Sequence, residues 1–420
     1  MQIGDLIAQK RDGGTHTAEE LAFIANGAAD GSLSDADLTS WLHAAFDNPL
    51  SPQETADLTL AMAHSGERVD LTGLPKPWVD KHSTGGVGDK TSIVLLPLLA
   101  SCGLTVVKMS GRGLGITGGT VDKLGSVPGF RLDLSPEEMK AQAAAIGVAL
   151  TGQTPRLAPA DKRLYAIRDV TGTVASVPLI VSSILSKKIA GGAEVVILDV
   201  KCGSGSFMKT LPEAEGLARA LLDTSKLCGL DLHTSITDMD QPLGRAVGNA
   251  LEVKEAIRVL KGEERGRFRD LCLHFAGLAL SATGKGSRSD AERALDSGLT
   301  LAKAKEWFGA QGGDLSVFDS EDWCVASSMT EVRAASSGWV ERIDARAIGQ
   351  AVVDMGGGRK HKEDEIDPTV GIVLHVEVGD SVEKGQTLAT VHGTGASIAS
   401  AIIIVGHDCS YRPVIVESVP

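Results

Sequence analysis

The chain has 420 residues, with 54 Asp and Glu against 41 Lys and Arg, and a formal net charge of −13. A content of 43% hydrophobic and 23% charged residues is typical of a soluble folded protein. The length indicates two or three domains. The acidic balance argues against nucleic acid or an anionic membrane as a partner, because both attract clustered Lys and Arg. The 49 glycines exceed the usual share of about 7%.

The N-terminus and the cysteines predict a cytoplasmic protein. Asp5 interrupts the apolar core that a signal peptide needs. The most apolar run, residues 93–100, is much shorter than the roughly 18 residues of a membrane span. The six cysteines are scattered without a CxxC pair, so we predict reduced thiols rather than a disulfide framework or a zinc site.

Residues 1–66 have the pattern of a helical unit. Thr17 with Glu20, and Ser51 with Glu54, have the spacing of capping boxes, so a helix is predicted to begin after each hydroxyl residue. Residues 71–77 then form a connector rich in Gly and Pro.

From residue 78, short β-branched runs alternate with Gly-rich turns and helical patterns, which predicts an α/β domain with a mixed, mainly parallel sheet. Residues 155–192 are again helical in character. From about residue 331, short alternating strands predict a small C-terminal α+β domain. The segment VGDSVEKGQTLATV in that domain is similar to the hammerhead folds of lipoyl carriers, but no modifiable lysine occupies a hairpin tip, which favours a structural role.

The glycine excess is concentrated in four segments: 81–92, 108–120, 202–206 and 355–359. In the first two, small residues let backbone N–H groups approach an anion, while Lys, Ser and Thr complete the shell. A helix expected near Thr91 adds the positive end of its dipole. Although one such turn is more often free of ligand, two in neighbouring βα units predict a phosphate site, with these candidate ligands: Lys81, Ser83, Ser92, Lys108, Ser110 and Thr120.

Two familiar nucleotide motifs are excluded by their details. Residues 85–92 have the wrong spacing for a P-loop, and Asp89 stands where its last glycine belongs. Residues 113–118 match GxGxxG, but Asp133 does not follow a clear second strand. We therefore predict no nicotinamide cofactor.

A second group of polar residues lies in the helical patterns between residues 165 and 188. Ser183 and Lys187 are four positions apart, so they share one helix face. With Arg168 they offer a donor fork, a point charge and a hydroxyl, which suits a planar ligand edge bearing carbonyl oxygens. On these residues alone, a solvated basic helix remains an equal alternative.

Seven motifs in order carry a resemblance to a known family: KHSTGGVGDK, SGRGLG-x-TGGT-x-DKL, GQTPRLAPADKRLYAIRDVT, SILSKKIAGG, LDVK-x-GSGSFMK, QPLGRAVGNALEV and MGGGR. Over nearly its whole length the chain resembles the pyrimidine-nucleoside and thymidine phosphorylases. The resemblance implies a homodimer of three-domain subunits: a helical dimerisation and base-binding domain (1–66 with 163–192), an α/β phosphate-binding domain (78–162 with 193–330) and the C-terminal α+β domain (331–420).

The resemblance also implies reversible phosphorolysis of uridine, thymidine or deoxyuridine to the free base and (deoxy)ribose 1-phosphate. Phosphate is the co-substrate and no cofactor is required. The phosphate ligands would be the six residues named above, and the nucleoside would be bound by Tyr165, Arg168, Ser183 and Lys187. The implied catalytic residues are Lys81, His82, Arg168 and Lys187, with His82 either a proton donor or a hydrogen-bond donor. In the broad-specificity branch, a monovalent cation such as K⁺ is held by Gly88, residue 90 (here Lys90), Leu243, Ala246 and Glu255.

Three residues depart from the family pattern. Ile116 stands where a histidine near the base is usual, and Gly125 replaces a glutamate. Lys90 lies at the implied cation site, so its ammonium group is a hypothetical substitute for the ion. Lys108, in contrast, is typical of members that accept uridine as well as thymidine, whereas thymidine-restricted members tend to have Met.

Three alternatives remain beside the broad-specificity phosphorylase. The first is a thymidine phosphorylase restricted to 2′-deoxynucleosides. The second is a catalytically impaired nucleoside-binding protein, motivated by Ile116 and Gly125. The third is another enzyme of similar fold, such as an anthranilate phosphoribosyltransferase, which would need a diphosphate-and-magnesium site.

Overall fold

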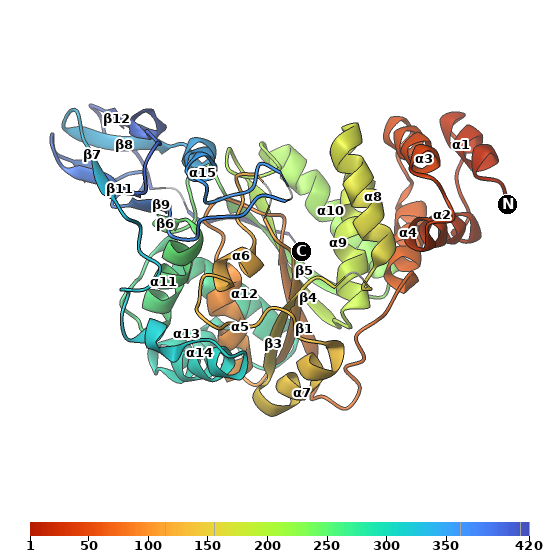
Figure 1. Ribbon diagram of the computed structural model, residues 1–420, viewed down its shortest axis with the longest axis horizontal. Coiled ribbons are helices and arrows are strands. Elements are labelled where there is room, and N and C mark those ends of the chain that lie inside the picture. The colour runs from red at the N-terminus through yellow and green to blue at the C-terminus, as the bar shows by residue number, and fades with distance from the viewer. Residues whose placement is uncertain (114, 155, 362, 412, 420) are drawn as a thin grey trace.

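The computed structural model describes residues 1–113, 115–154, 156–361, 363–411 and 413–419. Leu114 of the SGRGLG motif, Pro155 of the GQTPRL motif and Pro420 at the end of the predicted C-terminal domain lie outside the described residues. The chain forms a helical domain, a larger α/β domain and a small domain with antiparallel strands, which confirms the predicted fold class (Figure 1).

The helical domain combines two distant parts of the sequence. The capping boxes predicted at Thr17 and Ser51 are both formed, and each precedes a helix. Trp41 from the N-terminal part is fully buried and shares a core with Leu164 and Leu179 from the later segment. The helices are α1 (Ile3–Arg11), α2 (Ala18–Asp30), α3 (Asp35–Asp47), α4 (Pro52–His64), α8 (Pro159–Thr171) and α9 (Val177–Ala190).

A six-stranded sheet forms the centre of the α/β domain. The order is β13-β5-β4-β1-β2-β3, and every neighbouring pair is parallel except β13 with β5. From β1 the chain continues to β2 and β3 on one side, then crosses to β4 on the other. The carboxyl ends of β1 and β4 therefore lie at a topological switch point, where open α/β sheets bind ligands. The strands are β1 (Trp78–Ser83), β2 (Thr105–Ser110), β3 (Val148–Gly152), β4 (Val195–Cys202), β5 (Asp231–Asp238) and β13 (Ile415–Val419).

Helices cover both faces of this sheet (Figure 1). The helix expected near Thr91 begins there, and its buried apolar run packs in the main core although Pro97 lies within it. The helices of this domain are α5 (Thr91–Ser101), α6 (Thr120–Leu124), α7 (Pro136–Ile146), α10 (Leu211–Leu227), α11 (Asn249–Leu260), α12 (Arg267–Ala282), α13 (Arg288–Asp296), α14 (Leu299–Ala310) and the 3-10 helix η1 (Leu315–Phe318).

The C-terminal domain consists of two small antiparallel sheets, of order β10-β8-β12 and β6-β9-β11-β7. Its elements are β7 (Met329–Arg333), β8 (Gly338–Ile343), α15 (Ala345–Asp354), β9 (Gly371–Leu374), β10 (Ser381–Val382), β11 (Thr387–His392), η2 (Ala399–Ala401) and β12 (Ile402–Val405).

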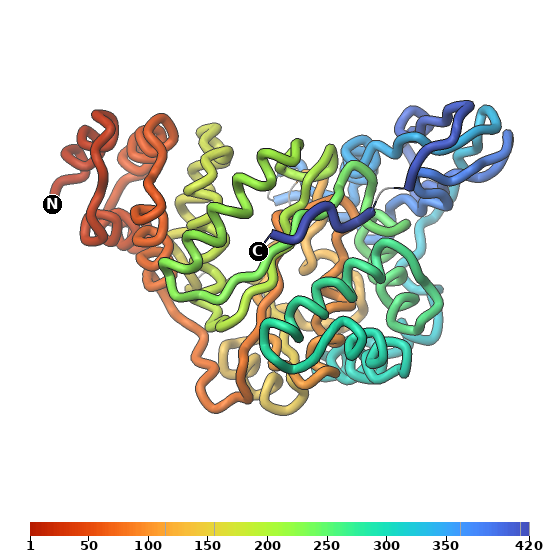
Figure 2. The backbone as a smooth tube through the Cα atoms, turned by 180° about the vertical axis from the view of Figure 1, so that it is seen from behind, coloured from red at the N-terminus to blue at the C-terminus, as the bar shows by residue number. Residues whose placement is uncertain are grey.

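Two exchanges of strands cross the domain boundary predicted at residue 331. Strand β6 (Ala246–Val247) comes from the α/β part of the chain but pairs with β9. Strand β13 leaves the C-terminal domain, pairs with β5 and becomes an edge strand of the central sheet; Figure 2 shows it in dark blue, apart from the other C-terminal strands. The interpretation of 331–420 as one separate unit is therefore incomplete, because the chain end completes the central sheet.

Among the described residues, no helix combines the length and the apolar character that crossing a membrane requires.

Candidate active site

Three loops meet at the carboxyl ends of the central strands. Residues 84–90 follow β1, residues 111–113 and 115–119 follow β2, and residues 203–206 follow β4. Gly86 and Ser206 form a β-bridge, which joins the first loop to the third. Gly113 and Gly119 approach so closely that a Cβ on either would lie 2.4 Å from the backbone nitrogen of the other. Close backbone contact thus explains part of the glycine excess.

Lys81 extends from β1 and is buried beside the first loop. Its Nζ lies 3.6 Å from Asp89 Oδ2. Burial opposes ionisation of Asp89, but Lys81, Lys201 and Lys123 together with the Ser83 hydroxyl hold the pKa of this carboxyl well below its usual range. Asp89 is therefore a fixed negative charge that orients Lys81.

Ser92, Ser110 and Thr120 lie at the edges of the same loops. Ser92 is buried in the first turn of α5, Ser110 ends β2, and Thr120 is the first residue of α6. The six predicted phosphate ligands thus lie on β1 and β2 toward their carboxyl ends or in the first turns of α5 and α6, the helices that follow these strands.

Lys108 connects the two neighbouring strands β1 and β2. These strands pair only at Trp78 with Thr105 and Val79 with Val106, and farther along Lys108 Nζ donates to the main-chain oxygen of Lys81. The same Nζ lies 3.6 Å from Asp80 Oδ1. Burial lowers the pKa of Lys108 to about 7, against the opposing effect of Asp80.

His82 lies on β1 within reach of four lysines. Burial first, and then the charges of Lys188, Lys108, Lys187 and Lys81, keep the pKa of His82 well below 6.5. The imidazole is therefore neutral at pH 7 in this arrangement. Because a neutral imidazole carries one N–H donor but no acidic proton, the structure favours the hydrogen-bond role over the proton-donor role.

Lys187 is held on the face of α9 that the sequence predicts. Its Nζ donates to Ser183 Oγ at 3.0 Å and to Asp161 Oδ2 at 2.5 Å. The first contact places Ser183 and Lys187 on one helix face, as their spacing predicts. The second ties α9 to α8, the helix that carries Arg168.

The sequence predicts that Arg168 offers its guanidinium donors to a ligand, but the structure places this side chain in a buried position. It is only 2% exposed, and its guanidinium donates to the main-chain oxygens of Leu179 at 2.9 Å and Val174 at 2.8 Å. Arg168 therefore closes the turn between α8 and α9, which the sequence did not predict. The Tyr165 ring centre lies 5.9 Å from the guanidinium carbon, and Tyr165 is 47% exposed.

Sequence reasoning missed the carboxylates that hold these lysines. Asp80 accepts from Lys188 Nζ at 2.7 Å and faces Lys108, while Asp161 holds Lys187. Asp161 precedes Arg168 by seven positions, which places both on one face of α8 and is a signal that could have been used. No comparable spacing distinguishes Asp80.

The residues predicted to hold a monovalent cation do come together, but around the side chain of Lys90. Its Nζ lies 2.6 Å from Leu243 O, 2.9 Å from Ala246 O and 2.6 Å from Glu255 Oε2, and Gly88 lies against the same carbonyls. An ammonium group and a metal ion cannot share these oxygens, because like charges so close repel strongly. The residues present do not fit a K⁺ ion.

The two other departures from the family pattern are Ile116, which lies against α15 of the C-terminal domain, and Gly125, which lies at the end of α6. The Ile116 main chain and Cβ pack against Gly349 of α15. Gly125 follows α6 with an ordinary helical φ of −64°, so no strained backbone requires glycine there.

The α/β domain and the helical domain both correspond to domains of a glycosyl transferase family. Family models agree: "Glycosyl transferase family, a/b domain" matches residues 75–303 and "Glycosyl transferase family, helical bundle domain" matches residues 4–66. "Pyrimidine nucleoside phosphorylase C-terminal domain" matches residues 339–405. The chain belongs to the pyrimidine-nucleoside phosphorylase family.

Curated relatives cover nearly all of the chain. The pyrimidine-nucleoside phosphorylase of Geobacillus stearothermophilus is 48% identical over 398 residues, covering 93% of this chain and 92% of the relative. That of Bacillus subtilis is 46% identical over 408 residues, covering 96% and 94%. The crystal structure of anthranilate phosphoribosyltransferase from Thermus thermophilus has a TM-score of 0.57 and 19% identity, covering 73% of this chain and 98% of that chain. This third likeness concerns the fold alone.

Proposed function

We propose that the protein is a broad-specificity pyrimidine-nucleoside phosphorylase. It catalyses the reversible reaction of uridine, thymidine or deoxyuridine with phosphate to give the free base and (deoxy)ribose 1-phosphate. The observation that carries this proposal is the convergence of buried lysines from β1, β2 and α9 near His82, in a chain 48% identical to a pyrimidine-nucleoside phosphorylase.

In the proposed reaction, an oxygen of HPO₄²⁻ forms a bond to C1′ while the bond from C1′ to the base nitrogen breaks. The electron pair of the broken bond leaves with the base, and the proton of the phosphate hydroxyl is taken up by the base overall. Positive charge therefore develops on the sugar and negative charge on the pyrimidine in the transition state.

Each group of residues has a proposed task in this reaction. Lys81, Lys108 and the hydroxyls of Ser83, Ser92, Ser110 and Thr120 hold the phosphate in line with C1′, which converts an encounter into a positioned attack. Lys187, with Ser183 beside it, stabilises the charge that grows on the pyrimidine, and this contribution strengthens as the bond breaks. His82, neutral in this environment, donates a hydrogen bond.

Arg168 acts in this proposal from a fixed position. Two of its donors are committed to Leu179 and Val174, so its contribution to the base is a rigid positive charge on α8 and the alignment of α8 with α9. Tyr165, exposed beside it, offers an aromatic face to the nucleoside.

The decisive assay is phosphate-dependent release of uracil from uridine and of thymine from thymidine. Release from both, lost when phosphate is omitted and restored by arsenate, supports the proposal. Turnover of 2′-deoxynucleosides with no cleavage of uridine identifies the thymidine-restricted alternative. Nucleoside binding without cleavage under any condition identifies a binding protein and refutes the enzyme.

We further propose a cytoplasmic homodimer that uses phosphate as co-substrate and needs no added cofactor. This part rests on the likeness to the phosphorylases. Light scattering that reports a single-chain mass of 43.6 kDa at assay concentration would refute the dimer.

A further inference from the structure

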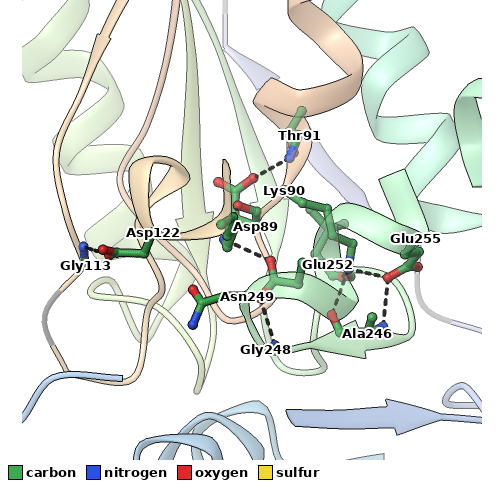
Figure 3. Close-up of polar contacts among 12 residues, drawn as sticks. Asp89, Lys90, Thr91, Gly113, Asp122, Ala246, Gly248, Asn249, Glu252 and Glu255 are labelled. Atoms are coloured by element: carbon green, nitrogen blue, oxygen red, sulfur yellow. Dashed lines mark hydrogen bonds and ion pairs between the residues drawn. The ribbon is translucent and has the colours of Figure 1, made fainter. Parts of the chain in front are cut away.

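Lys90 lies at the end of the first Gly-rich loop, immediately before α5, and is completely buried. Figure 3 shows its side chain directed away from Asp89, toward Ala246 and Glu255. The Nζ atom donates to Leu243 O at 2.6 Å and to Ala246 O at 2.9 Å, and it lies 2.6 Å from Glu255 Oε2.

These contacts neutralise the ammonium group and engage two of its three N–H donors. The two main-chain oxygens accept hydrogen bonds, and the Glu255 carboxylate is the ion-pair partner. Glu255 is 1% exposed, and its second oxygen accepts from Arg245 N at 2.8 Å, which fixes the carboxylate. Gly244 closes the cage, since a Cβ there would lie 2.3 Å from Glu255 Oε1 and 2.9 Å from Lys90 Nζ.

We propose that Lys90 is a tethered cation that permanently fills this oxygen cage, so that the fold and activity of the protein are independent of K⁺. Two carbonyls and a carboxylate are the oxygen ligands that a hard metal cation takes. The same set also suits an ammonium at charge-assisted hydrogen-bond distances. The covalent stem supplies the charge at all times, whereas an ion would supply it only at sufficient concentration.

The tether matters because of the elements it joins. Lys90 belongs to the loop after β1, Leu243 to the segment between β5 and β6, Ala246 to β6 and Glu255 to α11. A second buried lysine fastens the same loop: Lys123 Nζ donates to Asp89 O at 2.6 Å and lies 2.8 Å from Glu252 of α11. Two lysines thus anchor the proposed phosphate loop on one helix.

The first test compares the unaltered protein in KCl, NaCl and tetramethylammonium chloride at equal ionic strength. We expect Tm to agree within about 1 °C and kcat/KM within about twofold across the three salts. A saturable rise of either quantity that is specific to K⁺ would overturn the proposal.

The second test creates a K⁺ requirement. Lys90→Thr removes the tether, leaves the cage oxygens and adds a hydroxyl, so Tm should fall by roughly 5 °C or more in tetramethylammonium chloride. KCl should restore about half of that loss or more, with saturation. Lys90→Met fills the space with an apolar stem and should lose Tm without any response to K⁺. Lys226→Thr, the same change at an exposed lysine of α10, is the matched control and should behave as the unaltered protein.

Two results with the Lys90→Thr protein would refute the tethered-cation proposal. A folded Lys90→Thr protein whose Tm is as high as the unaltered one, or responds equally to all three salts, would show that the cage does not require a cation. If Lys90→Thr is insoluble in every salt, the comparison of salts on the unaltered protein still decides the matter.

This inference depends on the proposed function only for its effect on rate. If the unaltered protein shows no phosphorolysis but an unchanged Tm in all salts, the proposed function fails and the tethered cation stands. If it shows phosphorolysis that requires K⁺, the proposed function stands and the tethered cation fails.

Discussion

Lys108 should make anion binding depend on pH in the neutral range. Burial lowers its pKa to about 7, so the ammonium form predominates at pH 6 and the neutral amine at pH 8. A bound dianion favours the ammonium form and raises this pKa. Anion affinity should therefore fall as pH rises above 7, by up to about tenfold per pH unit, the equivalent of about 1.4 kcal/mol.

Sulfate isolates this effect, because it remains a dianion between pH 6 and 9 whereas phosphate itself titrates. We expect the inhibition constant of sulfate, measured against phosphate in the uracil-release assay, to be nearly constant from pH 6 to 7. It should rise about tenfold between pH 7.5 and 8.5. His82 does not contribute there, since its pKa lies well below 6.5, and the pKa of Asp89 lies well below its usual range.

Two substitutions test whether Lys108 causes the pH dependence of sulfate inhibition. Lys108→Met should give weak sulfate inhibition with no pH dependence in this range. Lys108→Arg keeps a permanent charge and should give inhibition that is equally flat but stronger than that of Lys108→Met. If the Lys108→Met protein retains the steep rise above pH 7, the titrating group lies elsewhere and the reasoning fails.

Three further substitutions test other parts of the site. Lys187→Ala should lower kcat by about 10² to 10³ in a protein that remains folded, with a lower Tm because the buried Asp161 loses its partner. Lys162→Ala, a change at an exposed lysine of α8, should leave kcat unchanged; near-normal phosphorolysis by Lys187→Ala would show the base site to be wrongly assigned. Arg168→Ala should lower kcat and also destabilise the fold by about 2–4 kcal/mol in urea unfolding, because it leaves buried carbonyls without donors; unchanged stability would contradict the bracing role. Arg359→Ala should raise KM for phosphate more than it lowers kcat, because Arg359 Nη1 donates to Asp122 Oδ1 at 2.8 Å beside the second loop. Arg359→Lys should recover part of the loss. If Arg359→Ala changes Tm alone, Arg359 does not support phosphate binding through this loop.

Much of the fold could be predicted because its determinants are local. The capping hydroxyls at Thr17 and Ser51 lie three residues from their acidic partners. The helix that begins at Thr91 follows a Gly-rich segment, which is typical of a turn. The parallel sheet follows from strands alternating with helices. The return of β13 to the central sheet could not be predicted, because a five-residue strand has no local signal for a partner almost 180 residues away.

The candidate site was predicted unevenly for the same reason. Ser183 and Lys187 are four positions apart on one helix, and their contact follows from that spacing. Which carboxylate holds each lysine depends instead on pairs far apart in sequence, as with Asp80 and Lys188. Arg168 shows a further limit: its residue type suits ligand binding and helix bracing equally, and only the positions of nearby carbonyls separate the two.

The distances between lysines and carboxylates distinguish structural pairs from those available to phosphate. Lys188 Nζ lies 2.7 Å from Asp80, a hydrogen-bonded pair. Lys81 lies 3.6 Å from Asp89 and Lys108 lies 3.6 Å from Asp80, too far for hydrogen bonds. Burial lowers the pKa of Lys108, and the nearby Asp80 carboxylate opposes that loss of the proton. The two carboxylates thus lie near the lysines proposed to bind phosphate without accepting hydrogen bonds from them, so an incoming dianion need not break any hydrogen bond to these carboxylates. In a chain of net charge −13, this arrangement is what the proposed phosphate site needs in order to attract an anion that the surface repels.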